Sequence, residues 1–182
     1  MKQERLNQEP AWSHRLAVAD LPPDGAALKL VPGEQERAAL AHYIGALAVP
    51  ALVTELKATP DGKGGVVVEG DLVATVRQTC VVSLEPFDNA VNEHIALRFL
   101  PESAATSAAV EDDGDERDPA DVVRGGAVDL GMLVAEFLAL GVDPYPRRPG
   151  AVFTPPDAAA EHEASSPFAA LAKLKQKGRQ GD

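Results

Sequence analysis

The sequence predicts an α+β fold in which an antiparallel sheet, a meander or a partly open barrel-like form, packs with two main helices. Two observations support this prediction. Apolar and polar residues tend to alternate with a period of two within residues 51–99, and short connections separate these stretches, as in antiparallel hairpins. Residues 34–47 and 130–140 instead place apolar residues three and four positions apart, which is the spacing of a helix face.

The N-terminal part is expected to hold two short extended segments and the first helix. Residues 12–19 and 28–31 are the extended segments, and the Pro-Pro-Asp-Gly sequence at 22–25 forms a turn between them. Residues 34–47 are predicted to be helical, because glutamates in the first turn interact favourably with the helix dipole. The apolar face of this helix is expected to consist of Leu40, Tyr43, Ile44 and Leu47.

Three longer stretches are predicted to form the sheet. Residues 51–59 end at a Pro-Asp-Gly turn, which is a strong hairpin signal. Residues 66–84 are rich in valine, and Gly70 within them indicates a bulge or a break. Residues 91–99 alternate apolar and polar side chains, with Glu93 as the exception. These stretches therefore predict adjacent antiparallel strands.

An acidic insert separates the last predicted strand from the second helix. Residues 102–121 carry a net charge of −7 and few large apolar side chains, so we expect them to be mobile. Asp129 is the expected cap of the second helix and Gly141 its stop. The core-facing stripe of this helix is expected to contain Leu130, Leu133, Val134, Phe137 and Leu138.

The domain organisation that follows is one α+β domain with a C-terminal extension. Residues 1–153 are expected to form the domain, residues 154–165 a linker, and residues 166–182 a short helix with a basic tail. Ser166 and Pro167 offer a cap and a first helical residue. Phe168, Leu171 and Leu174 would line one side of this short helix.

The charge distribution excludes a generic RNA-coating protein. The net charge of −11 resolves into −4 for residues 1–101, −7 for the insert, −3 for residues 122–172 and +3 for residues 173–182. A phosphate-binding surface over the whole body would need the opposite sign. The sequence shows no apolar run long enough to span a membrane, and residues 1–10 lack the apolar core of a secretory signal. We therefore expect a cytoplasmic protein.

Cys80 is the first candidate for chemistry. It is expected to lie in a strand, where nothing lowers its pKa, and His42 or His94 would have to approach it to form a nucleophile–base pair. The alternative is an inert buried cysteine, which is the common state of a free thiol. The histidines and Cys80 show no metal-ligand spacing, and no phosphate-binding loop is present. No cofactor or metal is expected.

Residues 143–150, Asp-Pro-Tyr-Pro-Arg-Arg-Pro-Gly, admit two interpretations. Three prolines hold the segment extended, and Tyr145, Arg147 and Arg148 follow one another closely within it. In the first interpretation the segment only follows the helix, with Tyr145 packed and the arginines paired to local acids. In the second it is a rigid docking element for phosphate or for an acidic partner.

Three stretches in this order resemble a known family. Residues 78–86 read Gln-Thr-Cys-Val-Val-Ser-Leu-Glu-Pro, residues 128–130 read Val-Asp-Leu, and residues 166–175 read Ser-Pro-Phe-Ala-Ala-Leu-Ala-Lys-Leu-Lys. The combination resembles the YceD family, the bacterial large ribosomal RNA subunit accumulation proteins, in an alphaproteobacterial-type form, over roughly residues 40–175. The family-motif positions are Cys80, Pro86, Asp129, Leu130, Glu136 and Pro144.

The resemblance implies a cytoplasmic, non-catalytic ribosome-biogenesis factor that supports accumulation or processing of large-subunit (23S) ribosomal RNA. Its expected partners are this RNA, a basic large-subunit ribosomal protein, or both. Protein L32 is a candidate because its gene often lies beside those of family members. Neither a membrane nor a small-molecule substrate is expected. Many family members carry Cys-x-x-Cys where this chain has Arg77 to Cys80, so a metal role of that pair is not expected here.

Candidate contacts and alternatives complete the sequence-based prediction. The candidate contacts with RNA or a partner protein are Tyr145, Arg147, Arg148, Phe168, Leu171, Lys173, Leu174, Lys175 and Lys177. One alternative is a protein-interaction module whose acidic insert shields a basic partner without direct RNA contact. A further alternative is a thiol- or metal-dependent hydrolase.

Overall fold

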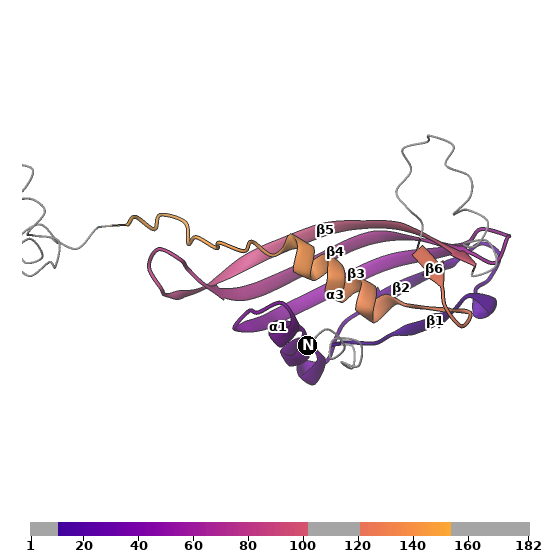
Figure 1. Cartoon of the computed structure of the whole chain (residues 1–182), viewed down its shortest axis with the longest axis horizontal. Coiled ribbons are helices and arrows are strands. Elements are labelled where there is room, and N and C mark those ends of the chain that lie inside the picture. Colours follow the sequence, from indigo (N-terminus) through magenta and orange to yellow (C-terminus); the bar gives the residue numbers. More distant parts are fainter. Residues whose placement is uncertain (1–10, 102–120, 154–182) are drawn as a thin grey trace, which may run out of the picture. The chain divides into compact units, whose positions relative to one another are not determined.

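The computed structural model describes residues 11–101 and 121–153 (Figure 1). The chain divides after Arg148 into two units, and the fold below belongs to the first. Most of the predicted acidic insert lies outside the described residues. The predicted linker and C-terminal helix, both beyond residue 153, lie outside them as well.

A five-stranded sheet of order β2-β3-β4-β5-β6 forms the centre of the first unit. Its strands are β2 (Ala26–Leu30), β3 (Ala48–Pro60), β4 (Val66–Thr79), β5 (Pro86–Pro101) and β6 (Asp121–Val123). Strands β2 to β5 form the predicted antiparallel meander, and the sheet stays open instead of closing into a barrel. Strand β6 pairs with β5 in parallel. Asp121, the last residue of the predicted insert, therefore begins a strand.

The two predicted main helices are confirmed as α1 (Glu34–Tyr43) and α3 (Leu130–Gly141). Helix α1 packs on β3, whereas α3 packs on β4 and β5, and α3 lies in front of the sheet in the view of Figure 1. Side chains from both helices and from the sheet form one apolar core. Neither helix of the described residues is long and apolar enough to cross a membrane.

Asp129 caps helix α3, as predicted. Its Oδ1 atom accepts hydrogen bonds from the backbone N–H groups of Gly131 (3.1 Å) and Met132 (3.2 Å), which satisfies donors that a helix start leaves unpaired. The predicted stripe is confirmed, with Phe137 partly buried and the other members fully packed: Leu130, Leu133, Val134 and Leu138.

Helix α1 is shorter than predicted, and only half of its predicted apolar face is packed in the core. It ends at Tyr43, and Gly45 follows in the left-handed region with φ of 69°. The Ala46 N–H bonds back to the Ala41 carbonyl at 2.9 Å, which is the pattern of a glycine-terminated helix end. The chain therefore turns before Leu47, which leaves that side chain exposed. Tyr43 is exposed as well, whereas Leu40 is fully buried and Ile44 packs against the core, as predicted, with Ala41 beside them.

The first predicted strand is also shorter than residues 12–19. Strand β1 (Arg15–Ala17) is followed by a 3-10 turn, Val18–Asp20. It pairs antiparallel with β7 (Ala127–Asp129), a strand that the sequence did not predict, in a separate two-stranded sheet. Trp12, which was expected to start the strand, lies in the core instead.

The predicted bulge at Gly70 is wrong. The register runs without interruption through this position, which pairs with Leu56 on β3 and with Ile95 on β5. Gly70 has a φ of 156°, and a Cβ atom there would overlap the backbone oxygen of Glu55. The backbone of β3 therefore lies too close for any side chain at this position. Such a close approach, like a bulge, is a common reason for a glycine inside a strand.

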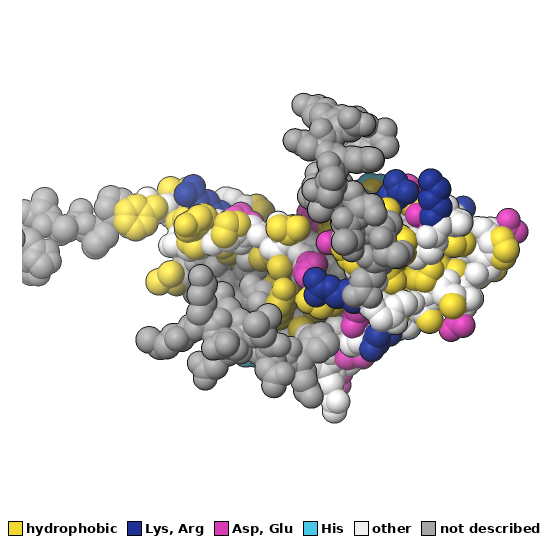
Figure 2. Space-filling model, turned by 45° about the vertical axis from the view of Figure 1, so that its right-hand side comes forward, with side chains coloured by type: hydrophobic (Ala, Val, Ile, Leu, Met, Phe, Trp, Pro, Cys, Tyr) yellow, Lys and Arg dark blue, Asp and Glu magenta, His cyan; other side chains and the backbone are white. Residues whose placement is uncertain are grey.

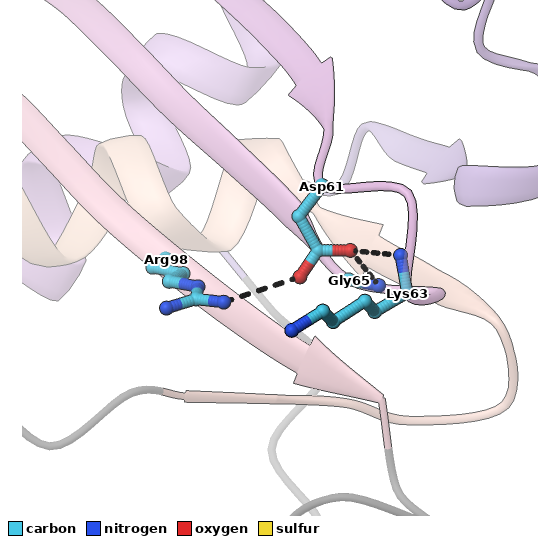
Figure 3. Close-up of polar contacts among 4 residues, drawn as sticks. All are labelled: Asp61, Lys63, Gly65 and Arg98. Carbon is cyan, nitrogen blue, oxygen red and sulfur yellow. Dashed lines mark hydrogen bonds and ion pairs between the residues drawn. The ribbon is translucent and has the colours of Figure 1, made fainter.

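Asp61 organises the predicted hairpin loop between β3 and β4 (Figure 3). Its Oδ1 atom accepts backbone N–H groups of Lys63 and Gly65, each at 2.8 Å, and its Oδ2 atom lies 3.5 Å from the Arg98 guanidinium. Burial opposes ionisation of this carboxyl, but these donors outweigh burial and lower its pKa. The loop thereby fixes Arg98 at the end of β5.

Candidate functional site

The candidate site begins at the connection between β4 and β5, residues 80–85, which we call the cysteine turn. The Cys80 N–H donates to the Glu85 carbonyl, and the Leu84 N–H donates to the Cys80 carbonyl, both at 2.9 Å. Leu84 has a φ of 58°, a left-handed conformation that closes the turn. Strand β4 consequently ends at Thr79, so Cys80 lies just beyond the strand in which it was predicted, and the stretch predicted up to Leu84 is too long.

Residues 143–148, which we call the strap, leave α3 and lie against the cysteine turn. Besides a bond to Cys80, three interactions hold the strap there: Val81 N–H donates to the Pro146 carbonyl (2.9 Å), Gln78 Nε2 donates to the Asp143 carbonyl (2.9 Å), and the Arg148 guanidinium pairs with the Glu85 carboxylate (2.8 Å). The strap is thus fastened at both of its ends and at Pro146, which is buried.

The Cys80 thiol lies between the turn and the strap and is fully buried. Its Sγ atom accepts backbone N–H groups of Val82 and Ser83, each at 3.4 Å, and of Arg148 at 3.3 Å. Two of these donors belong to the turn and one to the strap. The sulfur therefore joins the two segments.

The donors around Sγ favour the thiolate. The Ser83 hydroxyl and N–H, together with the Arg148 and Val82 N–H groups, outweigh burial and lower the pKa of Cys80 from 9.0 to about 6. The Ser83 Oγ atom is buried and has no other partner in the described part of the chain, so its hydrogen is available to the sulfur. A charged sulfur strengthens the hydrogen bond that holds the strap.

Two side chains of the strap point away from the Cys80 sulfur. Tyr145 is 72% exposed and Arg147 is exposed, so the ring and the guanidinium are presented to solvent. Arg148, in contrast, is engaged by Glu85. The first interpretation is therefore right for Arg148, which pairs with a local acid, and wrong for Tyr145, which is not packed. The second interpretation, a docking element, stays a prediction.

A groove of about 660 Å³ holds a second group of family-motif positions. Asp129 and Glu136 line it from the start and middle of α3, and Asp121 lines it from β6. Burial, followed by the negative charge of Asp121, raises the pKa of Glu136. Arg15 and Arg124 also line the groove, so charges of both signs meet there.

The remaining predicted positions have mixed outcomes. Pro86 is the first residue of β5, Leu130 is fully buried at the start of α3, and Pro144 lies exposed in the strap. His94 bonds to Asp71 rather than to Cys80. The candidate contacts beyond the strap lie outside the described residues: Phe168, Leu171, Lys173, Leu174, Lys175 and Lys177.

The described residues hold no group of three or more His, Cys, Asp or Glu side chains arranged for a metal ion. Arg77, at the position where many family members carry the first cysteine of the pair, forms two bonds with Asp88, at 2.7 and 2.9 Å. This contact with Arg77 lowers the pKa of the Asp88 carboxyl. An ion pair on the sheet thus occupies this position.

The sequence prediction missed Ser83, Gln78 and Glu85 as the groups that support Cys80 and the strap. All three stand in the stretch that carried the family resemblance, but nothing in its spacing indicates that Gln78 and Glu85 have partners more than sixty residues away or that the chain turns so that Ser83 meets Cys80. Figure 2 adds that acidic and basic side chains are interspersed over the face it displays, without a broad basic surface. Any RNA contact on this face must therefore be local.

Comparisons with known proteins give one match. A family model described as large ribosomal RNA subunit accumulation protein YceD matches residues 68–175, which is more than half of the chain. Within the described residues, this range includes nearly all of β4, the cysteine turn, α3 and the strap. No curated protein and no solved structure matches the chain.

Proposed function

Since the chain belongs to the YceD family of large ribosomal RNA subunit accumulation proteins, we propose that it supports accumulation of 23S ribosomal RNA as a non-catalytic, cytoplasmic binding factor. It binds large-subunit RNA through the strap, and it also binds a basic large-subunit ribosomal protein, with L32 as one candidate.

The exposed pair Tyr145 and Arg147 on a fastened strap is the observation that carries this proposal. An exposed ring offers a stacking surface for an unpaired base, and a guanidinium binds phosphate. Because the Cys80 anchor and the Glu85 ion pair fix the strap, little conformational entropy is lost when RNA binds. A local contact of this kind is compatible with an acidic body.

The burial of Cys80 supports a binding role over a hydrolase. A nucleophilic thiolate must reach its substrate, whereas this sulfur is fully buried and surrounded by the Ser83 hydroxyl and by backbone N–H groups of the turn and the strap. The strap would have to leave before any substrate could approach. We assign Cys80 a structural role, in which it positions Arg148 and, through it, Arg147.

Titration of the full chain with large-subunit RNA fragments tests the RNA contact. The Arg147→Ala variant should reduce the slope of log affinity against log salt by about one, because one phosphate contact is lost. The Tyr145→Ala variant should weaken binding about tenfold at every salt concentration, because base stacking is lost.

Arg124→Ala is the matched control, since Arg124 is an exposed arginine in a different loop. It should leave both the affinity and the salt slope unchanged. The proposal fails if the intact chain does not bind the RNA at about 50 mM salt. It also fails if Arg124→Ala and Arg147→Ala have the same effect.

A further inference from the structure

Strand β5 has a long outer edge that the described residues leave largely unpaired. On its inner side β4 pairs with it from Pro86 to Phe99. On its outer side β6 covers only Phe99–Pro101. Figure 1 shows β5 along the upper margin of the sheet, with β6 at one end. Within residues 11–101 and 121–153, no backbone group bonds to this edge between Pro86 and Arg98.

The register identifies which backbone groups face outward. The Cys80 N–H bonds to the Glu85 carbonyl, so this pair is of the hydrogen-bonded type, and the type alternates along an antiparallel ladder. Odd-numbered residues of β5 therefore bond to β4, and even-numbered residues face outward. Pro86, which has no N–H, fits an outward position. The outward residues that follow it, which we call the β5 edge, are Asp88, Ala90, Asn92, His94, Ala96 and Arg98.

The β5 edge has only some of the features that keep sheet edges from pairing. Edges are usually protected by lysine and other charged side chains, by inward-pointing charges, by proline or by bulges, and β5 carries one inward-pointing charge, Glu93. Here the prolines stand only at the strand ends, Pro86 and Pro101, with no lysine or register shift between them. The two basic side chains are engaged by acids, since His94 bonds to Asp71 at 2.8 Å and Arg98 pairs with Asp61.

Charge selects the chemistry of a partner strand. The described residues carry 15 acidic and 10 basic side chains. Glu93 stands in the middle of β5 on the side that faces α3, where a side chain of an added strand would reach it. These charges favour a basic strand over an acidic one.

We propose that the β5 edge binds an extended basic polypeptide segment as an additional strand. Backbone hydrogen bonds to the outward N–H and C=O groups supply affinity, and Lys or Arg side chains placed on every second residue meet Glu93. The inference rests on the proposed function, because it states how the basic ribosomal protein would bind. That protein would contribute an extended basic segment, and not a folded surface, to the β5 edge.

Amide hydrogen exchange of the full chain, resolved by residue, tests this inference. The probe is a capped peptide of about ten residues with alternating lysine and valine. Its binding should slow exchange at the six amides of the β5 edge, while the odd-numbered amides of β5 are already protected by β4. A second peptide of the same sequence, N-methylated at every residue, keeps the charge but has no backbone N–H left to donate on either edge, so it cannot pair as a strand. It should give no protection.

Paired variants separate strand pairing from charge attraction. Ala90→Pro with Ala96→Pro removes two outward N–H groups and leaves the bonds to β4 intact, so peptide affinity should fall about tenfold. Ala90→Ser with Ala96→Ser keeps these donors and should bind like the natural chain. The inference is overturned if the N-methylated peptide protects equally, or if the edge amides are already protected in a dimer without peptide, because a second copy then occupies the edge.

The RNA titration of the same proline variants keeps the two proposals apart. The strap lies outside the β5 edge, so RNA affinity should not change when the edge is blocked. In the natural chain, a lack of edge protection by the peptide together with normal RNA binding would overturn the edge inference alone. Edge protection in a chain that does not bind RNA would overturn the RNA contact alone.

Discussion

Cys80 shows how one buried atom can organise a surface segment. Its sulfur accepts N–H groups from its own turn and from Arg148, which lies 68 residues further along the chain. Burial alone would raise the pKa of the thiol, but the surrounding donors outweigh it and lower the pKa to about 6. The residue therefore supports the strap while remaining inaccessible.

The lowered pKa of Cys80 predicts a pH dependence of stability. Between pH 6 and pH 9 the unfolded chain binds more protons at this thiol than the folded chain, so its contribution to the free energy of unfolding rises with pH across this window. The contribution is fully present above the unfolded pKa and is lost as the pH falls through the folded one. Urea unfolding of the natural chain and of Cys80→Ser at both pH values measures it. The rise attributable to Cys80 should be absent in the variant, and an identical pH dependence would contradict this role.

Residue roles could be predicted from the sequence only where the partners are local. Asp129 was identified as a cap because its bonding partners are two and three residues away. The environment of Cys80 could not be predicted, because it combines a left-handed Leu84 with a donor from the distant strap. Neither feature has a signature in the sequence around the cysteine.

At the scale of elements, Gly70 leaves no room for a side chain between β4 and β3. Because a Cβ atom there would meet the Glu55 carbonyl, Gly70→Val should lower the free energy of unfolding by about 3 kcal/mol. Thr75→Val, on the same strand, should change it by no more than about 0.5 kcal/mol. Chemical denaturation measures both variants. Equal stability of the two would show that the strands can separate at Gly70 without cost.

Elements with strong local signals were predicted best. Helix α3 has a cap, a full apolar stripe and a terminal glycine, and its predicted extent agrees with the structure. Helix α1 has a weaker pattern. The spacing of Tyr43 and Leu47 predicted that both lie on its buried face, but Gly45 turns the chain between them and both side chains are exposed. Strands β6 and β7 are each three residues long, and they pair with strands that are distant in the sequence. The alternation of apolar and polar residues is too short in them to be recognised.

At the scale of the whole molecule, the two proposals use different surfaces. The strap, with Tyr145 and Arg147, is the proposed RNA contact, whereas the β5 edge, with its backbone groups beside acidic side chains, is the proposed contact for a basic protein segment. The overall charge of −11 argued against RNA coating, and the structure allows a contact confined to one arginine and one ring. A factor with both contacts can hold a ribosomal protein near the RNA on which it assembles.

The ratio of large-subunit to small-subunit ribosomal RNA in growing cells tests the central claim most directly. Cells whose only copy of the chain carries Tyr145→Ala and Arg147→Ala should accumulate less large-subunit RNA than cells with the natural chain or with Arg124→Ala. The variant protein must be present in equal amount and be equally stable. A ratio equal to that of the natural chain would contradict the claim that the strap supports accumulation of this RNA.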